Sequence, residues 1–161
     1  MIKPMRKDEQ KTHFNPLDFI YYSRGSVIPA VLAAAKHCYP RCGFEHCAAL
    51  ASAWLRKQRS GRERTACFFK LYGRDREGAN LYVLCTAVPP LLVERTLSGL
   101  AAALYEGGRL IVVSPLPGWR YKRRRGGPAA DSCSLASFWT EIEAAVTRAR
   151  LQASIPVNER L

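Results

Sequence analysis

Two apolar runs on either side of a short polar turn constrain the fold of this chain more than any other feature. Residues 65–72 and 80–88 are rich in aromatic and β-branched side chains, and residues 73–79 between them are polar and contain glycine. This pattern predicts a β-hairpin. The symmetric pairing gives one wholly apolar face, with Cys67 opposite Cys85, Phe69 opposite Val83 and Leu71 opposite Leu81.

Apolar periodicity predicts the remaining elements. Helices are expected at 26–38 with Ser26 as N-cap, at 44–58, from the Pro89–Pro90 pair to about 105, and from Ser132 or Ser134 to about 152. In the third helix Val93, Leu97, Leu100 and Leu104 are expected to face inward. Short strands are expected at 17–22, at the edge of the sheet, and at 110–114. The fold class is therefore α+β, a small mixed sheet with a β-hairpin, packed by about four helices.

The chain has 161 residues, which predicts one domain at 14–153, preceded by a mobile basic arm at 1–13 and followed by a loose tail at 154–161.

The longest apolar stretches are too short to cross a bilayer, so no membrane insertion is expected. The basic N-terminus continues into Asp8 and Glu9 where a signal peptide would be apolar. We therefore expect a cytoplasmic protein whose six cysteines are reduced.

A net charge of +12, from 25 Lys and Arg against 13 Asp and Glu, favours a nucleic acid, an anionic surface or an acidic partner. The charge is densest in the loop 118–128, where two aromatic residues and five cations follow the apolar run 110–113. These residues are Trp119, Arg120, Tyr121, Lys122, Arg123, Arg124 and Arg125. Such cations neutralise phosphates and such rings stack on bases, although a solvated basic loop has the same composition.

A second basic cluster begins with Arg56, Lys57 and Arg59 and continues to Arg64. It would extend the same phosphate-binding surface. The alternative interpretation is a solvated helix end, which suits the helix dipole equally well.

The segment 37–47 is rich in cysteine and histidine, the residues that hold structural zinc. The candidate ligands are Cys38, Cys42, His46 and Cys47. Their spacing matches no common zinc knuckle, and Cys47 falls on the apolar face of its helix. Buried small side chains are therefore the favoured interpretation, and zinc is not expected.

Acidic residues are sparse and show no metal-carboxylate spacing, and no Walker loop is present. Nuclease or ATPase chemistry is left open. Glu106 and Arg124, beside the basic loop, are the candidate catalytic residues, with ATP and magnesium as the corresponding cofactors.

The stretch 97–115 followed by the arginine-rich loop resembles the ParB/sulfiredoxin-like superfamily. In that superfamily a Leu- and Ala-rich helix ends in glycine, a short Ile/Val strand follows, and an Arg-rich Gly motif binds phosphate or nucleotide. The sequence departs from the pattern because no Glu precedes the arginines and the Gly-Gly-Cys-His-Arg motif is absent. The resemblance implies a compact α+β domain that binds nucleotide or DNA. Its small members include plasmid fertility-inhibition proteins of the Osa type, which act against conjugation.

The leading hypothesis is a basic protein that binds nucleic acid or nucleotide phosphates, with DNase or ATPase activity left open, in plasmid transfer or fertility inhibition. The alternative is a non-catalytic inhibitor or adaptor that docks its basic face on an acidic protein partner. A zinc-stabilised DNA-binding module is the third hypothesis. The nucleic-acid target and the oligomeric state are not encoded in any motif of the sequence.

Overall fold

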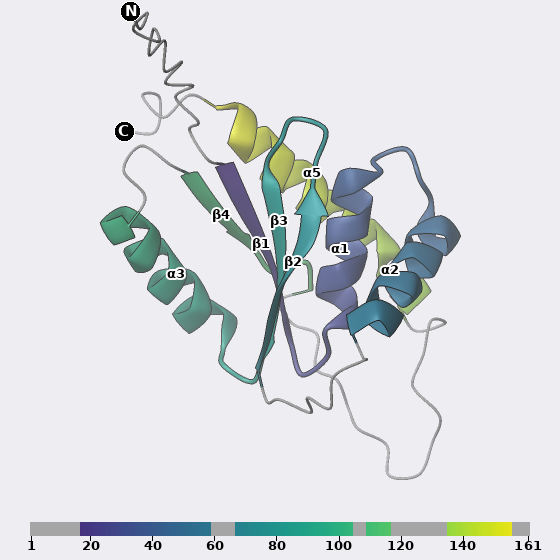
Figure 1. Cartoon of the computed structure of the whole chain (residues 1–161), viewed down its shortest axis with the longest axis horizontal. Coiled ribbons are helices and arrows are strands. Elements are labelled where there is room, and N and C mark those ends of the chain that lie inside the picture. Colours follow the sequence, from purple (N-terminus) through teal and green to yellow (C-terminus); the bar gives the residue numbers. More distant parts are fainter. Residues whose placement is uncertain (1–16, 59–66, 105–108, 117–134, 156–161) are drawn as a thin grey trace, which may run out of the picture.

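The computed structural model describes residues 17–58, 67–104, 109–116 and 135–155, which form a four-stranded mixed sheet flanked by helices (Figure 1). The strands lie in the order β2-β3-β1-β4. β1 is parallel to both β3 and β4, whereas β2 and β3 form an antiparallel hairpin. The predicted α+β class, with a mixed sheet, a hairpin and about four helices, is confirmed. The strands are β1 (Leu17–Arg24), β2 (Phe68–Arg74), β3 (Asn80–Thr86) and β4 (Arg109–Val113), and the helices are α1 (Ile28–Cys38), α2 (Phe44–Gln58), α3 (Pro90–Leu104) and α5 (Trp139–Ser154).

The two faces of the sheet are covered unequally (Figure 1). On one face, here called the covered face, α1 packs on β1 and β3, α5 packs on β4, and α2 packs on α1. On the other face, here called the α3 face, α3 packs on β4 and β1. Among the described residues no other helix lies on the α3 face.

The main core lies between the covered face and α1, α2 and α5. Phe19 and Tyr21 of β1 and Leu81 and Val83 of β3 point into it because alternate residues of a strand share a face. The alanine-rich sequence of α1 is almost entirely buried there. Small side chains let this helix approach the sheet closely.

The position of β1 differs from the sequence-based expectation. The run 17–22 was expected to be an edge strand, but β1 lies between β3 and β4 in the interior of the sheet. In the structure Asp18 is buried and accepts a hydrogen bond from Asn80 Nδ2 at 2.7 Å, which satisfies its charge inside the sheet.

The predicted hairpin is present, but its predicted register is wrong by one residue. Phe69 pairs with Leu84 and Leu71 pairs with Tyr82, and a bulge at Tyr72 shifts the register again before the turn. A one-residue slip moves side chains to the opposite face. Consequently Phe69 and Leu71 lie on the α3 face and are about half exposed instead of joining the core.

The slip also changes the partner of Cys85, which is Phe68 and not Cys67. The five described cysteines, Cys38, Cys42, Cys47, Cys67 and Cys85, are free thiols.

The helix bounds follow the sequence to different degrees. The bounds of α2 are those predicted, whereas α5 begins at Trp139, after an N-cap residue, Phe138, that makes no side-chain capping bond. The predicted caps Ser132 and Ser134 lie outside the described residues. α1 begins at Ile28, and the backbone N–H of Ile28 donates only a long 3.4 Å hydrogen bond to the Ser26 hydroxyl, the predicted cap.

One guanidinium group ties the last helix to the sheet. Arg109, the first residue of β4, donates from Nη1 to the Ala153 carbonyl at 2.7 Å and from Nη2 to the Gln152 carbonyl at 2.6 Å. These carbonyls belong to the last turn of α5, where backbone acceptors lack partners within the helix. The positive charge also suits the negative end of the helix dipole.

Candidate functional site

Three of the four strands end at the same edge of the sheet, here called the carboxyl edge. Because β1 is parallel to its two neighbours, the last residue of β1, Arg24, pairs with Thr86 at the end of β3, and Tyr21 pairs with Val113 at the end of β4. β2 runs the other way and begins at this edge, with Phe68 opposite Cys85.

The chain leaves the carboxyl edge in opposite directions from two adjacent strands. After β1 it passes to α1 on the covered face, and after β3 it passes to α3 on the α3 face (Figure 1). In open α/β sheets, ligands bind in the crevice outside the strand ends where the connections diverge in this way. Both helices also point their positive N-terminal ends toward this edge.

Hydrogen bonds connect the two turns that follow β1 and β3 at this edge. The Tyr22 hydroxyl donates to the Val88 carbonyl, and Arg24 Nε donates to the Ala87 carbonyl at 3.0 Å. Both bonds join β1 to the turn after β3. Gly25, with a φ of 78°, provides the left-handed backbone conformation that lets the chain reverse into α1. The hydrogen bond to Ala87 therefore holds the Arg24 guanidinium at the carboxyl edge.

The second basic cluster begins beside the carboxyl edge. The Trp54 ring contacts the rings of Phe68 and Tyr72, with 5.8 Å and 5.4 Å between centroids, so the C-terminal part of α2 lies along β2. Arg56 and Lys57 of the last turn of α2 are exposed. Arg59 and the rest of the segment 59–66 lie outside the described residues, and the described chain resumes at Cys67, directly before β2.

The chain that leads to the first basic cluster leaves β4 at the same edge. β4 ends at Val113, and the chain is described to Leu116, three residues beyond the carboxyl edge. The predicted phosphate-binding residues of the loop lie outside the described residues, as does Glu106. These loop residues are Trp119, Arg120, Tyr121, Lys122, Arg123, Arg124 and Arg125. The basic arm at 1–13 and the tail from 156 also lie outside the described residues, whereas Ser154 belongs to α5.

The structure does not bring the four candidate zinc ligands together. Among the described residues no group of three His, Cys, Asp or Glu side chains is placed to hold a metal. Cys47 is buried in the core, Cys38 Sγ lies 3.8 Å from the Arg74 carbonyl oxygen, and His46 is exposed against the Tyr39 ring. Burial raises the pKa of Cys38 and of Cys47 to about 11, so these thiols are protonated at neutral pH.

A second polar cluster, unforeseen from the sequence, lies at the opposite end of α1. The Tyr21 hydroxyl is 2.6 Å from His37 Nδ1, and His37 Nε2 is 3.2 Å from Asp75 Oδ2. A carboxylate accepts but cannot donate, so Nε2 carries the proton and Nδ1 accepts from the tyrosine. Burial lowers the pKa of His37 to about 4, against the opposing effect of Asp75.

This Tyr21–His37–Asp75 cluster has the connectivity of a catalytic triad, but the residue in the position of the nucleophile is not accessible to a substrate. Tyr21 is fully buried, and burial raises the pKa of its hydroxyl far above the ordinary value. A nucleophile needs contact with its substrate, which this hydroxyl lacks. The cluster therefore joins β1, α1 and the hairpin turn as a structural network. Its members come from three separate elements, so no spacing in the sequence could have identified it.

Comparisons with known proteins gave no match. No protein-family model matches the chain, and neither a curated protein nor a solved structure does. The ParB/sulfiredoxin-like resemblance therefore stays a prediction. No helix in the described part of the chain is long and apolar enough to cross a membrane.

Proposed function

We propose that this protein binds the phosphates of a nucleic acid or nucleotide at the carboxyl edge of its sheet. The observation that supports this proposal most strongly is that both basic segments join the sheet at this one edge. Arg56 and Lys57 precede one junction, the loop with its five cations follows the other, and Arg24 lies between them.

The width of the edge suits a chain of phosphates. Neighbouring strands lie about 4.8 Å apart, so the beginning of β2 and the end of β4 are separated by roughly 14 Å. That distance corresponds to about four nucleotides at ~3.4 Å per step along one strand. In this proposal Arg120 and residues 122–125 neutralise phosphates, and Trp119 and Tyr121 stack on bases.

The decisive experiment measures binding of labelled single-stranded and duplex DNA as a function of salt. If about five phosphates of duplex DNA are contacted, the slope of log affinity against log salt is roughly −4.5. Replacing Arg123, Arg124 and Arg125 by Ala is expected to weaken binding strongly and to bring the slope about three units closer to zero. The same binding measurement with ATP separates nucleotide binding from nucleic-acid binding.

A matched control removes the same charge elsewhere. Arg41, Arg76 and Arg148 are exposed and lie on the α1–α2 connection, the hairpin turn and α5, away from the carboxyl edge. Their triple Ala variant should retain most of the affinity. Equal losses in the two triple variants would show that only net charge matters, and absence of binding even at low salt would favour the acidic protein partner instead.

Turnover is a separate prediction. Nuclease or ATPase activity would rest on Glu106 and Arg124, and it is tested by incubating the protein with DNA, ATP and magnesium. A Glu106→Gln variant that retains both binding and cleavage would exclude this carboxylate from catalysis.

A further inference from the structure

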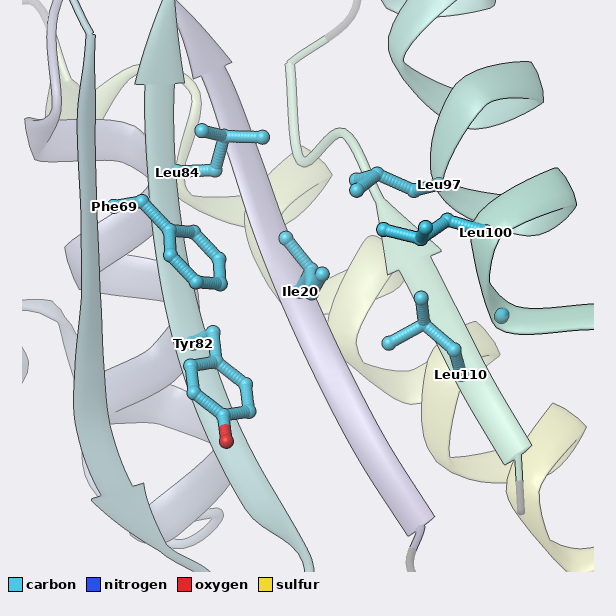
Figure 2. A pocket seen from close by; sticks show the side chains of 8 residues that line it. Ile20, Phe69, Tyr82, Leu84, Leu97, Leu100 and Leu110 are labelled. Atoms are coloured by element: carbon cyan, nitrogen blue, oxygen red, sulfur yellow. The ribbon is translucent and has the colours of Figure 1, made fainter. Parts of the chain in front are cut away.

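The α3 face contains an apolar groove that the described residues leave open (Figure 2). Ile20 of β1 forms its floor. Phe69 and Tyr82 lie on one side of it and Leu97, Leu100 and Leu110 on the other. The groove has a volume of about 420 Å³. Phe69 and Tyr82 are stacked, with centroids 5.3 Å apart and planes 9° apart, so this side of the groove is a flat aromatic surface.

The open part of the sheet has the width of one helix. α3 packs over β4 and β1, which leaves β2 and the adjoining side of β3 without a covering helix among the described residues. Two strands span roughly 10 Å, and a helix with its side chains is about 10–12 Å across. One additional helix would therefore complete this layer.

α3 itself has the composition of a helix that is buried on two sides. Its sequence from Pro90 to Leu104 contains only two charged residues, Glu94 and Arg95, in a chain of net charge +12. Val93 and Leu97 pack toward its own sheet. Leu91, Leu92 and Leu100 are nevertheless between 51% and 59% exposed. A helix that packs on only one sheet ordinarily carries polar residues on its outer side.

We propose that two copies of this chain dimerise through their α3 faces. In this dimer the α3 helix of each copy covers β2 and the adjoining side of β3 in the other copy. A two-fold axis parallel to the strands between the two sheets produces this arrangement. The rotation places each α3 between its own β1 and β4 and the partner's β2 and β3. Such an interface is isologous, since both copies use the same surface.

The exposed apolar area agrees with a dimer interface. Five large side chains, Phe69, Leu71, Leu91, Leu92 and Leu100, are each about half exposed. Together they present on the order of 500 Å² of apolar surface, which is near the upper limit for a functionless patch on a monomer. A standard interface buries about 800 Å² per partner, so these residues provide more than half of the required area.

The dimer also has a consequence for phosphate binding, and this consequence rests on the proposed function. A two-fold axis parallel to the strands keeps both carboxyl edges pointing the same way. The two cationic edges then lie side by side, separated by two sheet-to-helix spacings of about 10 Å each, or roughly 20 Å.

The first experiment measures the mass of the full chain in solution by light scattering during gel filtration over a range of concentrations. The expected mass is about twice 18.0 kDa. Phe69→Glu and Leu92→Lys each place a charge in the interface and are expected to give a mass near 18 kDa. Leu151→Glu is the control, because Leu151 is equally exposed but lies on α5, and this variant should remain dimeric.

A mixing experiment distinguishes this geometry from other dimers. Phe69→Glu and Leu92→Lys are individually monomeric, but in a mixed dimer one contact pairs the opposite charges and the other keeps both native residues. Equimolar mixing is therefore expected to restore a dimer, while circular dichroism of each variant confirms that it is folded.

Three results would overturn the proposal: a wild-type monomer at every concentration, a dimer that survives both interface variants, or folded variants whose mixture stays monomeric. A wild-type monomer that binds DNA in a salt-dependent way would remove the dimer and leave the phosphate-binding function in place.

Discussion

Both faces of the sheet carry apolar side chains, but these side chains are buried to different extents. On the covered face, strand residues such as Tyr21 and Val83 are fully enclosed by α1 and its neighbouring helices. On the α3 face, Phe69 and Leu71 remain about half exposed because α3 lies over only part of the sheet. The alternation of residues along a strand shows which side chains are apolar. Whether these side chains are buried depends on which helices pack over the sheet. The contrast shows where stability is concentrated and where a surface remains for assembly.

The largest expected effect is on the covered face. Leu32→Ala in α1 removes a side chain that is 1% exposed and is expected to lower the free energy of unfolding by about 3 kcal/mol. The same substitution at the half-exposed Leu100 of α3 should cost about 1 kcal/mol in the monomer. Urea denaturation at low protein concentration measures both. Equal losses would contradict the division of the molecule into a tightly packed face and an open one.

The next effect concerns pH and the polar network within the covered face. The unfolded chain protonates His37 near its ordinary pKa of 6.5, whereas the folded protein does so only near 4. The unfolded state therefore binds more protons between these values, and stability falls as pH decreases from 6.5 to 4, by about 3 kcal/mol from this group. Denaturation curves of the wild type and of His37→Gln should converge toward pH 4. Parallel curves would exclude His37 as the source.

A smaller effect is expected where α5 joins the sheet. Arg109→Met removes two hydrogen bonds to the last carbonyls of α5 and should cost about 1–2 kcal/mol. Thermal unfolding followed by circular dichroism measures this loss. Arg148→Met, an exposed cation of the same helix, is the control and should change stability by less than about 0.5 kcal/mol. Similar losses in both would show that charge near α5, and not the carbonyl bonds, matters.

The smallest effect is on the α3 face. Phe69→Leu keeps an apolar side chain but removes the stacking on Tyr82, which is worth about 0.5–1.5 kcal/mol. The loss should appear in monomeric protein at low concentration. If the dimer forms as proposed, the loss grows with protein concentration because dissociation is then part of unfolding. Independence from concentration would argue that Phe69 acts only within its own chain.

Local pattern accounts for most of the elements of the fold. The apolar stripe of α2 and the paired prolines before α3 are encoded within short windows, and both helices occur where the sequence places them. The hairpin register was wrong because the turn is centred on Glu77 and not on Arg76, and the bulge at Tyr72 then shifts the pairing by one residue; alternation alone indicates neither. The central position of β1 depends on crossovers to distant strands, which no local window contains.

For the proposed site, the sequence indicates the composition but not the location. The sequence identifies the basic segments, whereas the strand ends next to them lie at one edge because β1 pairs in parallel with β3 and β4. The Tyr21–His37–Asp75 cluster is a stronger example, since its residues come from a strand, a helix and a turn. Long-range topology, which arises from packing, brought both sets together.

The bulge at Tyr72 has a consequence for solubility. β2 is an edge strand, and a flat edge with exposed aromatic residues is a template on which further chains can add strands to build fibrils. A bulge twists such an edge and interrupts its regular row of donors and acceptors. Lys70 and Arg74, both exposed on β2, add repulsion between like strands. This strand can thus present Phe69 and Leu71 on its face while its edge resists aggregation.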